Sequence, residues 1–530
     1  MSNMIRNVLS EWGRAKVLVS LLMTLSASCA MAHPENDGRS KQYGAEFWRT
    51  REAPSGQSIN SKTVGKLAVK WVWEAAGDLP AMPAIDETSL YVGDGGGKLS
   101  RIDRSTGKTV WQVGVAALTG SDKILSLSGP ITRSIPALSD DRVVIGTRNG
   151  FAIAVSKDKG TLLWRTRLDE HQAAMVTGSP IIHHGVVYIG ISSTEAALAV
   201  DPSYPCCSFR GSAMALDLES GKVLWKTYTV PDGYSGGPIW GGPPIVDTAR
   251  GRVIFGTGQN YTVPASVGVC RLDPHAKPSD CMAKDNDFDS VVAFDLKTGV
   301  KVWAFHGERF DAWTLACGIP EFGFPALPQC AFPGSPDHDF GAGVNLFQIR
   351  GALGDKVDVI GAGQKSGKYW LLRADDGKEL WHTRVEEGGA GGGIMWGTSV
   401  ANNRIFVGMA NSIGKPLTLL DGTVTKRGGW AALNANDGSV AWKVAAPVDK
   451  GRGVGPTTVV NDVMFAASFD PAGYFYAFDT RNGDILWKFP SGGSSISAPV
   501  ILNNVVYWGS GYGAQGGTSN NKLYAFKIKR

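Results

Sequence analysis

Several polar and aromatic side chains occupy matching places beside short apolar segments of the sequence. Three residues before the proline that opens an apolar segment lie Arg133, Thr177 and Trp240. Just after the glycine that closes the following apolar segment lie Glu195, Gln259 and Lys365. Carboxylate and amide oxygens are ligands for a hard cation, basic groups bind anionic oxygens, and an indole ring offers a stacking face. If the fold brings these positions together, they suit a flat, polyanionic cofactor with a metal ion.

The sequence lacks the motifs of several other functional classes. It offers no Cys/His cluster typical of zinc. No C-x-x-C-H segment occurs, so we expect no covalent c-type haem on this chain. The balance of 53 basic to 48 acidic residues is too even for a nucleic-acid-binding face.

Two interleaved repeats predict the elements that must position these side chains. In the first, a polar turn closes on a glycine and a tryptophan follows four residues later. The glycine supplies the positive φ that the turn requires, and the flat indole suits the gap between neighbouring sheets. The pairs are Gly107/Trp111, Gly160/Trp164, Gly221/Trp225, Gly299/Trp303, Gly377/Trp381, Gly438/Trp442 and Gly483/Trp487.

In the second repeat, a proline or small residue opens one strand and a small residue closes the next strand ten residues later, as in Pro136 and Gly146. Two hairpins per unit make four strands, which is one blade of a β-propeller. Residues 523–526 repeat residues 475–478, but the Gly-Trp half that should follow has its counterpart at residues 66–71. We therefore predict an all-β, eight-bladed propeller whose N- and C-terminal strands share one blade, with Trp71 as the eighth repeat tryptophan.

The N-terminus has the pattern of a secretory signal peptide. Basic residues precede an apolar run over residues 17–25, and Ala30-Met31-Ala32 follows as a cleavage motif. We predict a signal peptide over residues 1–32, one propeller over residues 33–530, and a periplasmic or secreted location. The apolar run is too short to span a membrane permanently, so no transmembrane segment is expected in the mature chain.

Six cysteines follow the predicted cleavage site, and an even count in an exported protein favours disulfides. Their order suggests three local pairs, which are 206–207, 270–281 and 317–330.

With these motifs in place, the sequence resembles the quinoprotein alcohol dehydrogenases, which are eight-bladed propellers that bind pyrroloquinoline quinone (PQQ) and Ca²⁺. Within that family it most resembles the polyvinyl alcohol dehydrogenase branch, over essentially the whole mature chain. The segments that carry the resemblance are Ser192-Ser193-Thr194-Glu195, Cys206-Cys207-Ser208-Phe209-Arg210-Gly211, Ile239-Trp240-Gly241, Phe255-Gly256-Thr257-Gly258-Gln259-Asn260-Tyr261, Asp339-Phe340-Gly341-Ala342-Gly343-Val344-Asn345 and Met395-Trp396-Gly397-Thr398.

The resemblance implies a role for each matched position. Glu195 and Asp339 would be Ca²⁺ ligands, and the amide ligand would be Gln259 or Asn260, because the family has Asn where this chain has Gln259. Trp240 would be the floor on which the quinone stacks, and Trp396 would be a further wall. The cofactor's carboxylates and quinone oxygens would be bound by Arg133, Thr177 and Lys365.

The resemblance also makes Asp339 the general base that removes the alcohol proton as hydride passes to the quinone carbon, with Asp337 as a rival assignment. Gly341 lacks the extra carboxylate that lanthanide-using relatives place two residues after the base, which favours calcium. A Cys206–Cys207 vicinal disulfide would cover the cofactor; alternatively these cysteines pair elsewhere or brace a loop.

The sequence thus predicts periplasmic, PQQ- and Ca²⁺-dependent oxidation of a bulky secondary alcohol, such as polyvinyl alcohol, to the ketone. Because no haem motif is present, the electrons would leave to an external acceptor such as cytochrome c. The alternative is a non-catalytic propeller that acts as a protein-binding scaffold in the cell envelope.

Overall fold

A computed structural model of the chain describes residues 50–120 (numbered as in the printed sequence), 133–319, 323–351 and 354–529. All of them belong to one compact unit, Ser40–Arg530. The predicted signal peptide lies outside the described residues. Among the described residues, no helix is long and apolar enough to cross a membrane.

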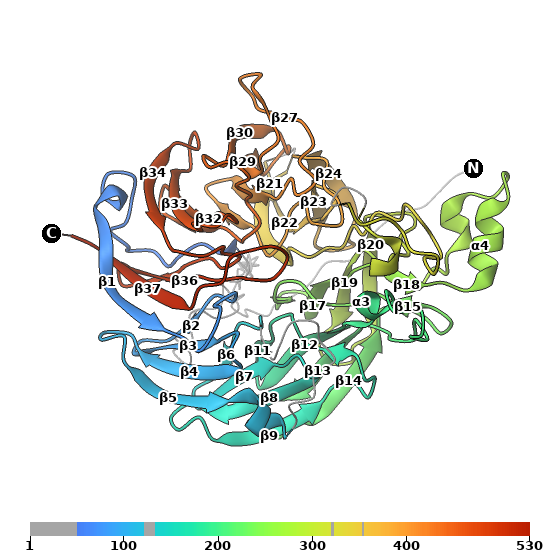
Figure 1. Cartoon of the computed structure of the whole chain (residues 1–530), viewed down its shortest axis with the longest axis horizontal. Helices are drawn as coiled ribbons and strands as arrows, with labels where there is room; N and C mark the ends of the chain where they lie inside the picture. The colour runs from blue at the N-terminus through green and yellow to red at the C-terminus, as the bar shows by residue number, and fades with distance from the viewer. Residues whose placement is uncertain (1–49, 121–132, 320–322, 352–353, 530) are drawn as a thin grey trace, which may run out of the picture. The chain divides into compact units, whose positions relative to one another are not determined.

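The described chain forms eight antiparallel sheets that follow one another around a central axis (Figure 1). We number these blades in chain order. Blade 1 contains β2 (Ala84–Ile85), β3 (Ser89–Gly93), β4 (Lys98–Asp103) and β5 (Thr109–Gly114). Blade 2 contains β6 (Ala137–Leu138), β7 (Arg142–Gly146), β8 (Phe151–Ser156) and β9 (Leu162–Arg167). Blade 3 contains β11 (Ile181–His183), β12 (Val186–Ser193), β13 (Ser212–Asp217) and β14 (Val223–Tyr228), with β10 (Ala174–Met175) paired to the end of β12.

The next four blades repeat this order from the axis outward. Blade 4 contains β16 (Ile245–Asp247), β17 (Arg252–Gly256), β19 (Ser290–Asp295) and β20 (Lys301–His306). Blade 5 contains β21 (Val344–Arg350), β22 (Lys356–Gly363), β23 (Lys368–Arg373) and β24 (Glu379–Arg384). Blade 6 contains β25 (Ser399–Ala401), β26 (Arg404–Met409), β29 (Gly429–Asn434) and β30 (Val440–Ala445). Blade 7 contains β31 (Thr458–Val460), β32 (Val463–Ala467), β33 (Tyr474–Asp479) and β34 (Ile485–Pro490).

Blade 8 closes the ring with strands from both ends of the described chain. It contains β35 (Val500–Leu502), β36 (Val505–Gly509), β37 (Lys522–Ile528) and β1 (Leu67–Glu74). Strand β1 pairs with β37 from Leu67 opposite Ile528 to Glu74 opposite Lys522. The predicted eight-bladed fold and its shared blade are therefore confirmed.

Short elements decorate the loops between the strands. Two small two-stranded sheets pair β15 (Ser235–Gly236) with β18 (Asn260–Thr262) and β27 (Leu417–Thr418) with β28 (Val424–Thr425). The helices are α2 (Val115–Thr119), α3 (Glu195–Leu198) and α4 (Ala265–Leu272), and the 3-10 turns are η1 (Val64–Lys66), η2 (Pro278–Cys281) and η3 (Leu315–Cys317).

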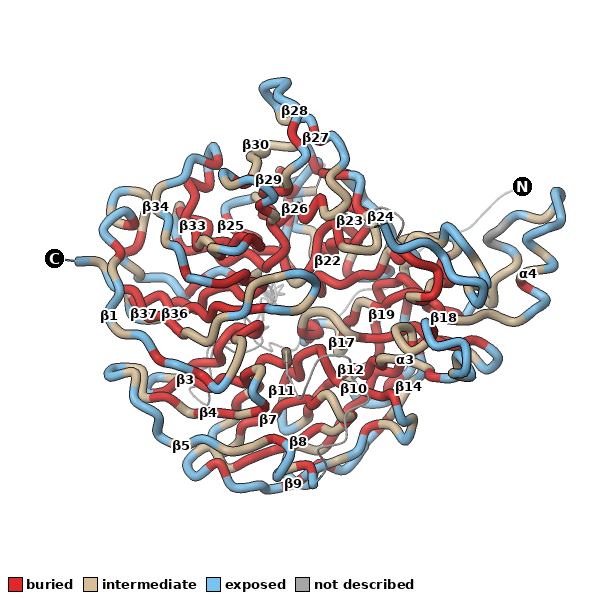
Figure 2. Tube along the Cα trace, in the orientation of Figure 1, coloured by how far each residue is buried: buried red, intermediate tan, exposed pale blue. Residues whose placement is uncertain are grey.

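Burial explains why the middle strands are continuous apolar runs. Strands such as β32 are buried along their whole length, because both faces pack against neighbouring blades (Figure 2). The outer strand β9 is mostly exposed, and Trp164 is its one buried residue, as expected for a strand at the solvent edge of a blade.

The repeat tryptophans join each blade to the next. Seven of the eight indoles pack on the turn glycine of the following blade, and a Cβ atom on that glycine would lie less than 3 Å from the ring. The eighth, Trp487, instead joins blades 7 and 8 by donating to the carbonyl of Leu67 at 3.2 Å. Trp225, for example, contacts Gly299, which has φ of 69°, and its Nε1 donates to the carbonyl of Leu296 at 3.0 Å. The other contacts of this kind are Trp71/Gly107, Trp111/Gly160, Trp164/Gly221, Trp303/Gly377, Trp381/Gly438 and Trp442/Gly483. The glycine therefore serves both the turn and the neighbouring indole.

Replacing Gly299 should separate these two requirements. In Gly299→Ala the new Cβ would lie 2.5 Å from Trp225, whereas Gly251→Ala, in the same blade at φ of 65°, meets nothing within 4 Å. Both variants adopt a left-handed conformation that costs about 1–2 kcal/mol. Only Gly299→Ala must also displace the indole, which adds about 1–3 kcal/mol. The free energy of unfolding, measured with urea, should therefore be lower for Gly299→Ala than for Gly251→Ala. Equal losses of free energy in the two variants would show that the indole contact does not contribute to stability.

A buried carboxyl group after β24 makes stability depend on pH. Glu386 is buried, its Oε2 accepts the N–H of Asn411, and its Oε1 has no hydrogen-bond partner among the described residues. Burial raises the pKa of Glu386 from 4.5 to about 8, although the N–H groups of Asn411 and Ala410 and the charge of Lys443 oppose the rise. Between these values the folded protein holds a proton that the unfolded chain has lost, so stability falls as pH rises.

The free energy of unfolding should therefore fall between about pH 5 and about pH 8, by up to about 1.4 kcal/mol per pH unit from this group. Glu386→Gln keeps an acceptor for Asn411 but cannot ionise, so its stability should decline less steeply over the same range. Parallel pH profiles for the two proteins, measured by urea unfolding, would contradict the assignment.

Candidate active site

A cavity of about 200 Å³ brings together residues from loops that are far apart in the sequence. Its walls include seven residues singled out from the sequence, which are Arg133, Trp240, Gln259, Asp337, Asp339, Lys365 and Trp396. The loops that enter β6, β16, β21 and β25 carry five of these, and the loops that follow β17 and β22 carry Gln259 and Lys365. Because the blades repeat, equivalent loops from different blades meet at this cavity.

A buried ion cluster occupies one wall of this cavity. Lys365 Nζ lies 2.9 Å from Asp337 Oδ1 and 2.6 Å from Asp339 Oδ2. Burial would lower the pKa of Lys365, but Asp337 and Asp339 outweigh it and raise the pKa above its ordinary value. Burial raises the pKa of Asp337 well above its ordinary range, although Lys365 opposes the rise. The side chain of Lys365 is therefore an ammonium ion that both carboxyl groups contact.

The Asp339 carboxylate is held by three donors from other residues. Its Oδ1 accepts the backbone N–H of Gln259 at 2.8 Å. Its Oδ2 accepts the indole N–H of Trp240 at 3.0 Å and also forms the ion pair with Lys365. A Cβ on Gly258 would lie 2.5 Å from Asp339 Oδ1, so only glycine lets the carboxylate approach this closely. The orientation of Asp339 is fixed from blades 4 and 5 together.

Two indole rings and two cations line the cavity next to Asp339. Lys365 Nζ lies 5.1 Å from the centroid of the Trp240 ring, and the Arg133 guanidinium lies 4.4 Å from that of Trp396. The two rings meet edge to face, with centroids 5.2 Å apart. Trp396 has φ of 65°, an uncommon conformation for a bulky residue. The combination offers aromatic faces beside positive charge.

Thr177 lies behind this wall and supports it. Its hydroxyl donates to the carbonyl of Trp240 at 3.0 Å, and it lines a narrow cavity of about 40 Å³ together with Arg133 and Trp396. Arg51, which the sequence patterns do not mark, lines the same cavity and donates to the carbonyl of Trp396 at 3.2 Å. It precedes every repeat unit, so no periodicity could identify it.

The two candidate amide ligands have different surroundings. Gln259 lines the cavity, and its Oε1 is buried without a hydrogen-bond partner among the described residues. The Asn260 amide instead exchanges hydrogen bonds with the Asn286 amide, at 3.1 and 2.9 Å, and also donates to the carbonyl of Ser235. Gln259 therefore has a free acceptor in the cavity, whereas the Asn260 side chain is already paired.

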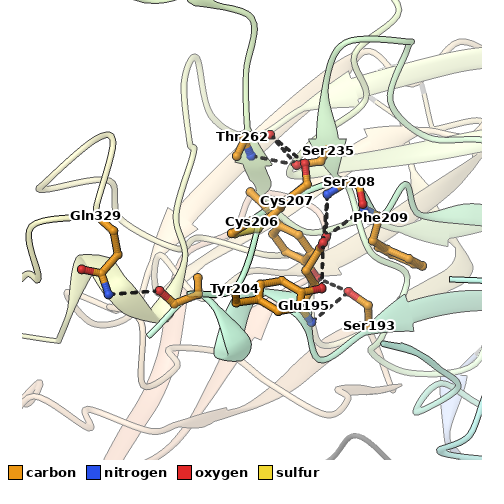
Figure 3. Close-up of a disulfide and its surroundings, with 12 residues drawn as sticks. Ser193, Glu195, Tyr204, Cys206, Cys207, Ser208, Phe209, Ser235, Thr262 and Gln329 are labelled. Atoms are coloured by element: carbon orange, nitrogen blue, oxygen red, sulfur yellow. Dashed lines mark hydrogen bonds between the residues drawn. A yellow bond between two sulfur atoms is a disulfide. The ribbon is translucent and has the colours of Figure 1, made fainter. Parts of the chain in front are cut away.

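Glu195 begins α3, and its carboxylate turns into the following loop (Figure 3). It accepts the N–H groups of Ser208 at 2.9 Å and Phe209 at 2.8 Å, and the hydroxyl of Tyr204 at 3.1 Å. Burial would raise the pKa of Glu195, but the contact with His171 and these backbone donors hold it below its ordinary value. Glu195 is thus a well-partnered carboxylate, and it is not among the described residues that line the cavity.

The adjacent cysteines lie in the same loop and form a disulfide (Figure 3). The other bridges are Cys270–Cys281 and Cys317–Cys330, so the three predicted local pairs are confirmed. Cys206 is exposed, and neither Cys206 nor Cys207 is among the described residues that line the cavity.

Two further buried carboxyl groups, Asp289 and Asp311, lie behind the cluster. The Oδ2 atom of Asp311 accepts the N–H of His338 at 2.8 Å, which anchors the backbone between Asp337 and Asp339. Burial raises the pKa of Asp289 well above its ordinary range, and the neighbouring Asp311 raises it further. Burial also raises the pKa of Asp311 to about 7, although the N–H of His338 and the contact with Asp289 oppose the rise. In the sequence, Asp289 ends an acidic segment that is typical of a solvated loop, so its burial could not be foreseen.

The cavity fits a flat anionic ring system and, at one point, a hard cation. The aromatic faces and the cations of Arg133 and Lys365 suit the anionic ring system. The unpartnered Gln259 oxygen suits the cation. Among the described residues, no three carboxylate, His or Cys side chains gather into a metal site of their own.

Comparison with known proteins agrees with this architecture. The chain matches the PQQ_2 family model, described as outer membrane protein assembly factor BamB, over residues 40–304 and 426–529. A polyvinylalcohol dehydrogenase from a Pseudomonas species is 27% identical over 92% of this chain and 76% of the relative. Another from a Sphingopyxis species is 28% identical over 89% of this chain and 74% of the relative.

Among solved structures, the quinohemoprotein alcohol dehydrogenase from Comamonas testosteroni superposes with a TM-score of 0.67 at 18% identity, covering 90% of this chain and 79% of that one. This likeness supports the propeller fold. The chain therefore belongs to the PQQ_2 family of propellers, and its predicted resemblance to the quinoprotein alcohol dehydrogenases, including the polyvinyl alcohol dehydrogenases, is confirmed.

Proposed function

We propose that this protein is a PQQ- and Ca²⁺-dependent alcohol dehydrogenase that oxidises a bulky secondary alcohol, such as polyvinyl alcohol, to the ketone. The observation that carries the proposal is the Asp339 carboxylate, held in a cavity between the Lys365 ammonium and the Trp240 indole. Two relatives named as polyvinylalcohol dehydrogenases, similar over about nine-tenths of this chain, support the substrate class.

In this proposal Asp339 accepts the hydroxyl proton of the alcohol at a carboxylate oxygen. PQQ, when bound, supplies the two-electron acceptor that takes the hydride. Lys365 stabilises the carboxylate form of Asp339, and the indole N–H of Trp240 orients it. Arg133 and Lys365 would bind anionic oxygens of the cofactor, Thr177 would hold the Trp240 backbone, and Trp240 and Trp396 would provide aromatic walls and exclude water.

Gln259 and Asp339 are the residues that we propose to hold Ca²⁺. The free Oε1 of Gln259 supports its choice over Asn260. The family resemblance also assigns Glu195, which would then share its carboxylate between the ion and the donors of its own loop. The Cys206–Cys207 bridge beside Glu195 would brace that loop rather than contact the cofactor directly.

We further propose that residues 1–32 are a signal peptide and that residues 33–530 act in the periplasm. Three disulfides support an oxidising compartment. Electrons would pass to an external acceptor such as cytochrome c, since the sequence has no haem-attachment motif.

The alternative function, a binding scaffold in the cell envelope, is favoured by the description of the matching family model. That model does not match residues 305–425, the segment that contains Asp337, Asp339, Lys365 and Trp396. Buried charges cost stability, and a scaffold has no use for three of them in an axial cavity. The enzyme is therefore the better-supported proposal.

A dye-linked assay tests the proposal directly. Protein reconstituted with PQQ and Ca²⁺ should reduce an artificial electron acceptor with a secondary alcohol as donor, and silence across many alcohols would favour the scaffold. Asp339→Asn should lower kcat by about 10²–10⁴-fold, since it removes the base, while PQQ binding measured by absorbance persists. Asp337→Asn serves as the matched variant, because it alters the other carboxylate on Lys365. A larger loss in Asp337→Asn would transfer the role of base to Asp337.

Removal of the Gln259 amide tests the metal site. Gln259→Ala should weaken Ca²⁺ binding to the PQQ-loaded protein by about tenfold or more, because even indirect partners of metal ligands are worth that much. Gln259→Asn retains a shorter amide and should lose less affinity. Isothermal titration with Ca²⁺ measures both, and an unchanged affinity in Gln259→Ala would exclude it as a ligand.

A further inference from the structure

The narrow cavity of about 40 Å³ behind the aromatic wall is separate from the active-site cavity. Among the described residues, the two cavities share Arg133 and Trp396 and no other wall residue. The walls come from the loops that enter the inner strands of every blade except blade 5, together with Arg51. A space bounded by so many blades lies on the axis of the ring. We call it the inner cavity.

Two arginine side chains give the inner cavity positive walls. Arg51 is 3% exposed, and its Nη2 donates to the carbonyl of Trp396 at 3.2 Å. The Arg133 guanidinium lies 4.4 Å from the centroid of the Trp396 ring, so both cations contact the same residue. Burial lowers the pKa of Arg51 to about 10, which leaves the side chain charged at neutral pH. No aspartate or glutamate is among the described residues that line the inner cavity.

A third arginine adds to the positive charge beside the inner cavity. Burial and, after it, the charge of Arg133 lower the pKa of Arg148 to about 10, although Tyr512 opposes this. The effect of Arg133 on Arg148 shows that like charges repel here with little screening. A negative charge next to Arg133 would offset this repulsion.

Two wall residues have donors that face no acceptor. The Oγ of Ser179, a residue that is 5% exposed, accepts the backbone N–H of Ile135 at 2.9 Å, and its own O–H has no acceptor among the described residues. The Arg133 guanidinium forms no ion pair or hydrogen bond with the described residues. Because a guanidinium carries N–H donors on more than one edge, Arg133 can serve the inner cavity and the active-site cavity together. The hydroxyl of Thr177 is already used, since it donates to the carbonyl of Trp240.

The size of the inner cavity restricts what can occupy it. A volume of about 40 Å³ holds about two or three water-sized atoms, so a monatomic ion fits. In so narrow a space, one occupant contacts the walls on several sides, including those formed by Arg51, Arg133 and Ser179. A cation would be repelled by both guanidinium groups, and water would leave their charge without compensation. The walls therefore favour a small anion.

We propose that the inner cavity binds one small inorganic anion, such as chloride, between the guanidinium groups of Arg51 and Arg133, with the Ser179 hydroxyl as a further donor. The ion offsets the buried positive charge and holds Arg51, which in turn anchors the Trp396 backbone behind the active site. The site is formed by the protein alone, so this proposal does not rest on the proposed alcohol oxidation.

Bromide tests the site directly, because it replaces chloride and its anomalous scattering identifies it. Crystals of the cofactor-free protein soaked in sodium bromide should show an anomalous peak in the inner cavity. Arg51→Met, which keeps a long side chain without its charge, should lose the peak, and Arg51→Lys should keep part of it. A wild-type crystal without the peak would overturn the proposal, as would an equal peak in Arg51→Met.

Arg452→Met is the matched control. Arg452 is also an arginine whose pKa is lowered by burial, but it lines a larger cavity of about 840 Å³ that adjoins the active site at Ala390, Gly391 and Gln515. Its replacement should leave the bromide peak unchanged. Loss of the peak in Arg452→Met would show that it depends on the total charge rather than on the walls of the inner cavity, and would overturn the site.

Thermal unfolding gives the same test in solution. Tm of the wild-type protein and of Arg452→Met should rise with chloride and reach a plateau, relative to gluconate, an anion too large for the cavity, at equal ionic strength. Arg51→Met should need at least about tenfold more chloride for the same rise, because it loses a charged donor to the ion. Equal rises in chloride and gluconate would overturn the site.

The cofactor supplies the last comparison, because its carboxylates are anions too. If the ion has a site of its own, the bromide peak should persist after PQQ is added. Loss of the peak on adding PQQ would overturn a separate anion site and would assign the inner cavity to a carboxylate of the cofactor.

Discussion

The contact between a repeat tryptophan and the turn glycine of the next blade is the interaction on which the rest of this molecule depends. The indole can lie against the turn only because glycine has no Cβ, and the turn can form only because glycine accepts a positive φ. One residue type thus meets two constraints, and the spacing of glycine and tryptophan follows from them. Repeated at seven of the eight junctions between blades, the contact fixes how one sheet meets the next and directs the loops beside the inner strands toward the axis.

That regular frame allows an irregular and costly site. Lys365, Asp337 and Asp339 are all buried, and removing Lys365 would leave both carboxyl groups without their cation. They are held because each comes from a loop that a rigid strand anchors, and because the backbone between the two carboxylates is tied to Asp311. The stability of the ring thus offsets the cost of burying charged groups at its centre.

The sequence predicted the parts that obey the repeat and missed the parts that depend on contact between blades. The eight blades, the shared blade and the cysteine pairs could be predicted, because spacing along the chain determines them. The positions of Trp240 and Lys365 relative to their strands could also be predicted, and these residues do line one cavity. Spacing could not reveal that Asn286 occupies the Asn260 amide, or that Glu195 turns toward Ser208 and Phe209. Those partners lie in other loops, and only the packed structure determines which oxygens remain free.

The ring also places the residues proposed for the oxidation and the loops that would contact the rest of the substrate on different blades. The carboxylate that would take the proton, its lysine and the amide beside it come from blades 4 and 5, whereas the walls of the larger cavity next to the site come mainly from loops of blades 6, 7 and 8. Because the indole contacts hold each blade independently of what its loops carry, loops of blades 6, 7 and 8 can change without moving Asp339. Substrate range in such a propeller can therefore diverge while the oxidation chemistry is retained.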